Sequence, residues 1–155
     1  FRQAWRHLAG LAGEAGNDRL HATLILMGWS LEPASGRAWH DYYPGPAYVD
    51  VLGWDQYNPT ERRGWYQPAS EMFANIVAVS RAEALPFGIA ELGSGLVVGD
   101  TGAQRAEWLR TVARHLADEG ARFALYFDLD WTTQGGPDYR LRDEPSSVAW
   151  REFCS

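Results

Sequence analysis

The amino-acid sequence predicts an α/β fold built on a small parallel sheet. Four apolar segments, which we expect to be strands, cover residues 22–28, 48–54, 86–90 and 122–127. Helical patterns separate the last three segments, and this alternation is typical of units in which a helix joins consecutive parallel strands. The 155 residues suit one domain of ordinary size, and the 46% hydrophobic content is enough for a core.

Hydrophobic spacing predicts the helices. Apolar residues recur at three- and four-residue intervals over residues 2–14, from Pro68 onward and over residues 102–119, which is the repeat of a helix that buries one face. A short last helix should begin near residue 146. The residues expected to be buried are Trp5, Leu8, Leu11 and Ala12 in the first helix, Met72, Phe73, Ile76, Val77 and Val79 in the second, and Trp108, Leu109, Val112 and Leu116 in the third.

The expected strands leave two topologies open. The segment 22–28 is apolar on both faces, which indicates a buried parallel strand, and a long polar and aromatic loop follows it. Four parallel strands could form a doubly wound domain. They could also form about half of an eight-stranded barrel, which normally takes roughly 250 residues.

Composition excludes several classes of function. The net charge of −6 argues against nucleic acid or an anionic membrane as the main partner, and no apolar run is long enough for a membrane-spanning helix. The single cysteine, Cys154, excludes an internal disulfide framework and a cysteine-rich zinc site. No signal segment is visible in the sequence.

Each predicted strand is followed by a carboxylate close to an aromatic ring. These carboxylates are Glu32, Asp55, Glu91 and Asp128. Reactive groups of α/β folds lie at the carboxyl ends of the strands, so these positions are candidates for a site. Glu91 stands out because small residues follow it. A carboxylate there could attack an anomeric carbon or activate a water, or it could cap a turn or pair with an arginine.

Two blocks of sequence carry a family resemblance. Residues 42–58 read Tyr-Tyr-Pro-Gly-Pro-Ala-Tyr-Val-Asp-Val-Leu-Gly-Trp-Asp-Gln-Tyr-Asn, and residues 85–94 read Leu-Pro-Phe-Gly-Ile-Ala-Glu-Leu-Gly-Ser. They resemble the sixth and seventh strands of glycoside hydrolase family 26, a β-mannanase-like family with (β/α)8 barrels. Residues 4–7, 24–30 and 139–150 are similar to its fourth helix, fifth strand and closing segment. The resemblance implies a partial (β/α)8 barrel of about four βα units, the second half of the barrel, as a single partial domain over residues 1–155.

The resemblance also implies roles for individual residues. Glu91 matches the nucleophile, and Tyr57 matches a tyrosine that donates a hydrogen bond to it and orients it. Asp55 matches a position beside the nucleophile. Trp29 would form a wall of the sugar site, and the ring beneath the sugar would be either Trp131 or Tyr126, a choice that the strand register leaves open. No cofactor or metal is implied, and the family suggests an extracellular enzyme.

One part of the family pattern is absent from this chain. The acid/base glutamate of the family ends the fourth strand, and this sequence begins in what resembles the following helix. Only Glu32 and Asp128 are close enough in the sequence pattern to replace it. We therefore expect this chain to be half of a retaining glycosidase that acts on a β-linked polysaccharide, such as mannan. Its partner would be the missing amino-terminal half of the barrel, which would supply the acid/base.

The incomplete barrel and the function each leave alternatives. Leu24, Leu26, Val49 and Val51 should lack part of their core, since half of a barrel exposes two strand edges and its inner face. One alternative function is a non-catalytic carbohydrate-binding or scaffolding protein on the same barrel. Another is a small doubly wound domain whose acids bind Mg²⁺.

Overall fold

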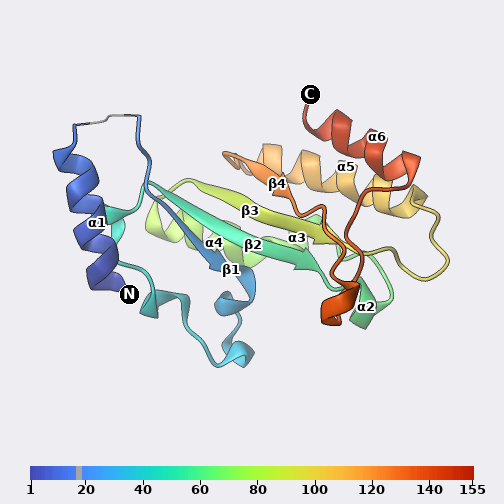
Figure 1. Cartoon of the computed structure of the whole chain (residues 1–155), viewed down its shortest axis with the longest axis horizontal. Helices are drawn as coiled ribbons and strands as arrows, with labels where there is room; N and C mark the ends of the chain where they lie inside the picture. Colours follow the sequence, from blue (N-terminus) through green and yellow to red (C-terminus); the bar gives the residue numbers. More distant parts are fainter. Residues whose placement is uncertain (17–18) are drawn as a thin grey trace.

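The computed structural model describes residues 1–16 and 19–155 and contains one parallel sheet (Figure 1). Each strand pairs in parallel with the next, in the order β1-β2-β3-β4, which confirms the α/β prediction. The strands are β1 (Thr23–Met27), β2 (Val51–Asn58), β3 (Phe87–Ser94) and β4 (Ala124–Tyr126).

The helices occupy the predicted regions with two differences: the short helix over residues 60–63 was not expected, and the helix expected after Pro68 is divided. The bounds are α1 (Arg2–Glu14), α2 (Thr60–Arg63), α3 (Ala69–Met72), α4 (Ala74–Glu83), α5 (Ala103–Asp118) and α6 (Glu144–Phe153). The helix expected after Pro68 is split into α3 and α4, because Phe73 has φ −102° and ψ 1°, which is not helical. Short 3-10 turns fill the long loop between β1 and β2. None of the helices in the described ranges is long and apolar enough to cross a membrane.

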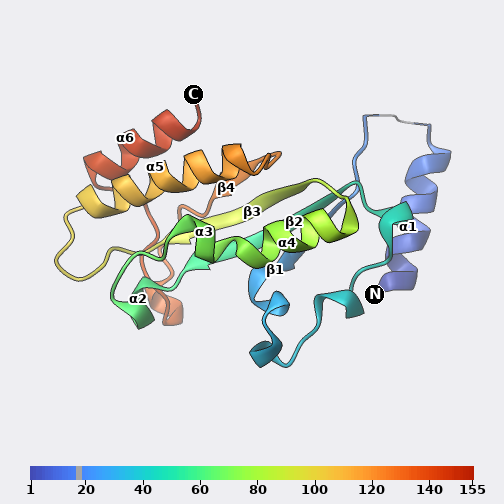
Figure 2. The ribbon, with the colours of Figure 1, turned by 180° about the vertical axis from the view of Figure 1, so that it is seen from behind.

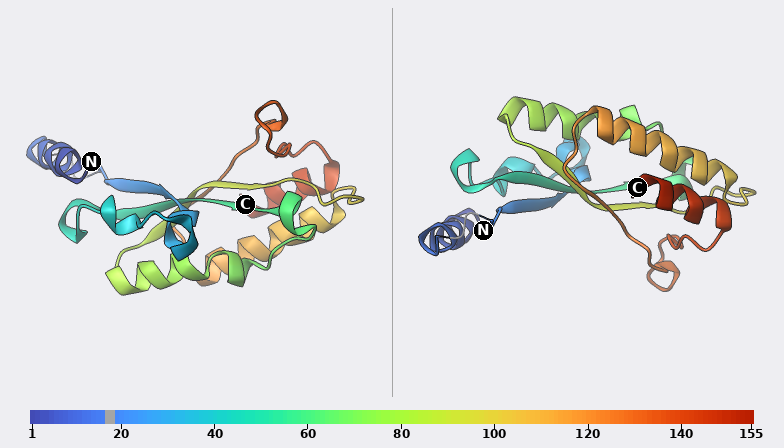
Figure 3. Two further views of the ribbon diagram at one scale, coloured as in Figure 1. Left: turned by 90° about the horizontal axis from the view of Figure 1, so that it is seen from below. Right: turned by 90° about the horizontal axis from the view of Figure 1, so that it is seen from above.

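The order of the strands distinguishes the two topologies. A doubly wound sheet reverses its strand order at a switch point and carries helices on both faces. Here the spatial order follows the chain without a reversal. Figure 3 shows α4 and α5 on one face of the sheet, while the chain between β4 and α6 crosses the other face. This is the arrangement of one arc of a (β/α)8 barrel.

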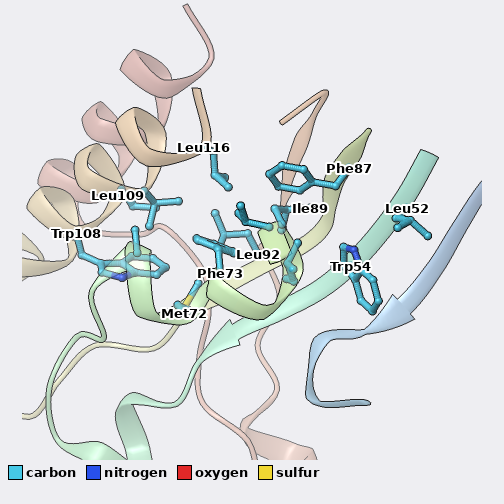
Figure 4. Close-up of a cluster of buried hydrophobic side chains, with 14 of the residues drawn as sticks. Leu52, Trp54, Met72, Phe73, Phe87, Ile89, Leu92, Trp108, Leu109 and Leu116 are labelled. Carbon is cyan, nitrogen blue, oxygen red and sulfur yellow. The ribbon is translucent and has the colours of Figure 1, made fainter. Parts of the chain in front are cut away.

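The core lies between the sheet and the helices α3, α4 and α5 (Figure 4). Trp54 of β2, Ile89 and Leu92 of β3 and Leu109 of α5 are completely buried in it. The buried positions predicted for the third helix are all confirmed. In the second helix Val79 is only partly buried, and the other four predicted residues are buried.

The opposite face of the sheet is largely open. Ile25, Met27 and Leu125 lie on it and are 51%, 36% and 57% exposed. The expectation that the first strand is buried on both faces was therefore wrong, because β1 is an edge strand that has helices on one side only. Leu24 points to the helices and is buried, as is Val49, so neither of them lacks a core.

Helix α1 stands at one end of the molecule (Figures 1 and 2). It is tied to the loop before β2 by Trp5, whose Nε1 donates to the carbonyl of Tyr48 at 2.7 Å, and by Arg6, which donates to the carbonyl of Pro44. Leu8 and Leu11 were expected to be buried and are instead exposed, since no part of the sheet lies beneath this helix.

Candidate active site

A β-bulge in β3 decides which face of the sheet carries Glu91. Trp54 pairs with Ile89, but the next residue, Asp55, pairs with Glu91, so Ala90 is an extra residue in β3. Side chains of a strand alternate between faces, and a regular β3 would place Glu91 with Ile89 against the helices. The bulge shifts the alternation by one residue. Glu91 therefore shares the open face with Asp55.

Tyr57 and Glu91 form the central contact of this face. The Tyr57 hydroxyl donates a hydrogen bond to Glu91 Oε2. Burial, with the hydrogen bond to Glu91 and the charge of that carboxylate, raises the pKa of Tyr57 above its ordinary value, so the phenol remains a proton donor in this contact. Both residues lie within their strands and not beyond the strand ends, because β2 and β3 extend further than the sequence predicted.

Aromatic rings surround the phenol of Tyr57. The ring of Tyr139 lies 5.0 Å from that of Tyr57, and Phe127 contacts both rings at 5.6 and 5.7 Å between centroids. Trp131 extends the cluster, since its ring lies 5.5 Å from Phe127. Gly93 makes the packing possible: a Cβ at this position would come within 2.8 Å of both the Tyr57 and the Tyr139 rings.

Asp55 is the second carboxylate of the site. Burial, and then the negative charge of Glu91, raise the pKa of Asp55 from 3.8 to about 6. Its Oδ1 is buried and finds no hydrogen-bond partner in the described parts of the chain. A carboxylate left unpaired beside a second acid costs free energy when it is ionised. Near neutral pH the fold therefore tolerates this group at some expense to its stability.

Replacing Asp55 with asparagine should change how stability depends on pH. A raised pKa in the folded state favours the protonated acid, so the contribution of Asp55 is complete below pH 4 and is lost as pH rises through about 6. The original chain should therefore lose stability between pH 4 and pH 7, and Asp55→Asn should not. Over this range we expect the free energy of unfolding of the variant to rise by about 1–2 kcal/mol relative to that of the original chain, after allowance for solvent screening. Urea denaturation at a series of pH values measures this difference, and a difference independent of pH would contradict the expectation.

A cavity of about 700 Å³ adjoins the site on the β1 side. Trp29, Asp55, Tyr57 and Tyr139 line it, together with polar residues of the chain after β1 and β2. Trp29 is 38% exposed, and the Arg37 guanidinium lies over its ring at 5.6 Å. A partly exposed indole beside hydroxyl and carboxylate groups is suited to stacking on a sugar ring.

The structure brings together most of the residues that the sequence singled out. Asp55, Tyr57 and Glu91 adjoin one another, Trp131 joins them through Phe127, and Trp29 lines the adjoining cavity. Tyr126 lies apart from this group. Its ring packs against Trp150 of α6 at 5.3 Å, and its hydroxyl donates to backbone carbonyls, so it faces the helix and not the open side of the sheet.

The remaining acids of the strand ends have other surroundings. Glu32 is exposed and lines the cavity next to Trp29. Asp128 accepts a hydrogen bond from the Leu141 amide at 2.8 Å, and Asp130 forms an ion pair with Arg140 at 2.6 Å. Within residues 1–16 and 19–155, no cluster of three His, Cys, Asp or Glu side chains could hold a metal ion.

Sequence reasoning missed Tyr139 and Phe127 as parts of the site. Tyr139 comes from the chain after β4, far from Tyr57 in the sequence, and no local pattern places the two together. Gly93 was the available signal, because a glycine inside a strand often marks a close approach of other groups.

The strand order, the one-sided helices and the carboxylate on the open face define a partial (β/α)8 barrel of the kind that carries glycosidase sites. The model of the family described as "Glycosyl hydrolase family 26" matches residues 20–116. The chain belongs to glycosyl hydrolase family 26, which confirms the resemblance found in the sequence.

A solved structure agrees with this fold. The chain is similar to the structure of a GH26 β-mannanase from Bacteroides ovatus, BoMan26A, with 15% identity and a TM-score of 0.61, over 98% of this chain and 42% of that one. The endo-β-1,4-mannanase from Thermotoga petrophila gives 18% identity and a TM-score of 0.47, over 68% and 26%. The chain thus spans less than half the length of either structure. No curated protein matches it significantly.

Proposed function

We propose that this chain forms part of a retaining glycoside hydrolase that cleaves a β-linked polysaccharide of the mannan type. The hydrogen bond from Tyr57 to Glu91, on the open face of a family 26 barrel segment, is the observation that carries the proposal. The neighbouring aromatic rings and the cavity beside Trp29 supply surfaces suited to sugar rings. Family membership also suggests that the substrate is met outside the cell.

In the first step Glu91 acts as the nucleophile. Tyr57 donates to Oε2 and thereby holds the carboxylate in one orientation, and Oε1 is the oxygen that attacks. A new bond forms between Oε1 and the anomeric carbon, and the glycosidic C–O bond breaks. The leaving oxygen takes a proton from an acid, and the result is a glycosyl ester on Glu91.

In the second step water regenerates Glu91. The acid of the first step now accepts a proton from the water, which attacks the anomeric carbon from the face opposite to the ester. The ester C–O bond breaks and its electrons return to the Glu91 carboxylate. Two inversions at one carbon give net retention of configuration.

Residues outside this chain would supply the acid/base. We propose that they also complete the barrel, as its amino-terminal half. The unpaired outer edges of β1 and β4 and the exposed Ile25 and Leu125 on the open face support this proposal, since a closed barrel would cover all of them. The Bacteroides ovatus β-mannanase is more than twice as long as this chain, which also supports the proposal.

A mechanism-based label tests the nucleophile without requiring the acid. A dinitrophenyl 2-deoxy-2-fluoro-β-mannoside carries a leaving group that departs as the stable phenolate, and the fluorine slows hydrolysis of the ester that forms. We expect incubation with the purified chain to release dinitrophenolate once per molecule, and peptide mass spectrometry to find the sugar on Glu91. An unactivated manno-oligosaccharide should remain uncleaved by the same sample.

The outcomes separate the candidate functions. A label on another carboxylate would overturn the assignment of Glu91. Rapid cleavage of the unactivated oligosaccharide would show that this chain contains its own acid/base. Binding of the oligosaccharide without any labelling would favour the non-catalytic carbohydrate-binding protein.

A further inference from the structure

A buried arginine connects three segments behind the site. Arg105 of α5 is 1% exposed, and its Nη1 donates to the Ser94 carbonyl at the end of β3, at 3.0 Å. Its Nη2 donates to the Arg140 carbonyl at 3.1 Å and to the carboxylate of Asp143. Its Nε donates to Ser146 Oγ at 2.9 Å. One side chain thus fixes β3, the chain around residue 140 and the start of α6.

Tyr126 supports the same backbone from β4. Its hydroxyl lies 2.8 Å from the Tyr139 carbonyl and 3.3 Å from the Ser94 carbonyl, and it donates mainly to the nearer one. Burial raises the pKa of Tyr126 to about 12, so it remains a donor at any ordinary working pH. Arg105 and Tyr126 therefore bind the consecutive carbonyls of Arg140 and Tyr139.

These bonds lie behind the ring that touches Tyr57. The Tyr139 side chain packs on the Tyr57 ring and on Gly93, two residues after Glu91 in β3. The backbone of Tyr139 is held from the helix side, and its ring presses on the tyrosine that donates to Glu91. The chain of contacts runs without interruption from Tyr126 through Tyr139 and Tyr57 to Glu91.

We propose that Tyr126 and Arg105 are positioning residues for the nucleophile, and that they act through the backbone of residues 139–140 and the Tyr139 ring. Neither residue touches the sugar in this proposal, so Tyr126 takes a role different from the substrate contact that the sequence suggested. The inference rests on the proposed function of Glu91. A shift of an attacking group by about 1 Å can cost about 100-fold in rate, so a small loosening of this support should be measurable.

Tyr126→Phe is the test variant, because it removes the hydroxyl and keeps the ring that packs on Trp150. We expect the maximal labelling rate with the fluorinated dinitrophenyl mannoside to fall about tenfold. The concentration that gives half of the maximal rate should change less than about twofold, because substrate contacts are kept. Arg105→Lys, which keeps the charge and loses the fork of donors, should show the same pattern.

Tyr66→Phe is the matched control. The Tyr66 hydroxyl donates to Asp100 at 2.7 Å, accepts from the Val97 amide and is also partly buried beside α5. Within the described residues, no hydrogen bond or ring contact joins it to Tyr57, Tyr139 or Glu91. Thermal melts of all variants are recorded first, and labelling is measured well below the lowest melting temperature. The control should label at a rate within about twofold of the original chain, despite losing a comparable hydrogen bond.

The results separate failure of the positioning role from failure of the proposed function. The positioning role is overturned, while Glu91 remains the nucleophile, if Tyr66→Phe slows labelling as much as Tyr126→Phe does. It is also overturned if Tyr126→Phe and Arg105→Lys both label at the original rate. If the original chain is not labelled at Glu91, the proposed function fails and the positioning role fails with it. A fall in affinity at an unchanged maximal rate would make Tyr126 a determinant of binding and would also overturn the proposal.

Discussion

Glu91→Gln should reduce labelling by the dinitrophenyl 2-deoxy-2-fluoro-β-mannoside by at least about 10³-fold, because an amide is a much poorer nucleophile than a carboxylate. The substitution keeps the shape of the side chain, and the amide oxygen can still accept the hydrogen bond from Tyr57. Affinity for manno-oligosaccharides should therefore survive. Phenolate release measures the rate, and isothermal titration calorimetry measures the binding.

Glu119→Gln provides the control for this prediction. Glu119 lies at the end of α5 and pairs with Arg81 on the surface, away from the open face. Its amide variant should label at the original rate. Labelling of Glu91→Gln at a similar rate would mean that the sugar is transferred to another group, and the assignment of the nucleophile would then be wrong.

Arg105→Met should produce the largest loss of stability, about 3–5 kcal/mol in the free energy of unfolding. The variant leaves the carboxylate of Asp143 and the carbonyls of Ser94 and Arg140 without their common donor. Burial tends to raise the pKa of Asp143, but hydrogen bonds from the Ser146 hydroxyl and amide, and then the hydrogen bond and charge of Arg105, outweigh it and lower the pKa. Urea denaturation at neutral pH, with the slope of the transition checked for two-state behaviour, measures the change.

Another arginine of the same helix supplies a direct comparison. Arg110 also belongs to α5 and pairs with an acid of α6, Glu152, but this pair is exposed to solvent. Surface ion pairs contribute little, so Arg110→Met should change the urea midpoint far less than Arg105→Met. Equal losses at the two positions would contradict the view that the buried hydrogen bonds of Arg105 hold these segments together.

The sequence was most informative where the signal was local. The spacing of Trp108, Leu109, Val112 and Leu116 identified the buried face of α5, because helical periodicity depends only on near neighbours. It was less informative for β1, where exposure depends on what covers each face of the sheet. Ile25 looks like a core residue in the sequence and is half exposed, since the helices cover only the other side.

The candidate site also has parts that local sequence patterns predict and parts that they do not. The motifs around Tyr57 and Glu91 identified two residues that the structure joins by a hydrogen bond. No sequence pattern predicted the β-bulge at Ala90, although this bulge turns Glu91 away from the core. The sequence likewise did not decide whether Tyr126 or Trp131 lies on the open face with Glu91, because that choice depends on the register of β4 against β3.

By itself, then, the order of residues determined most of the helices, the approximate strands and the family, and it singled out the carboxylate at position 91 as a candidate. Only the tertiary structure decided that the strands follow one another without reversal, that Glu91 faces Asp55, and that Tyr139 supports Tyr57. The physical reason is the range of the forces involved. Helical periodicity arises within a few residues, whereas bulges, strand register and contacts such as that between Arg105 and Ser94 depend on the packing of segments far apart in the chain.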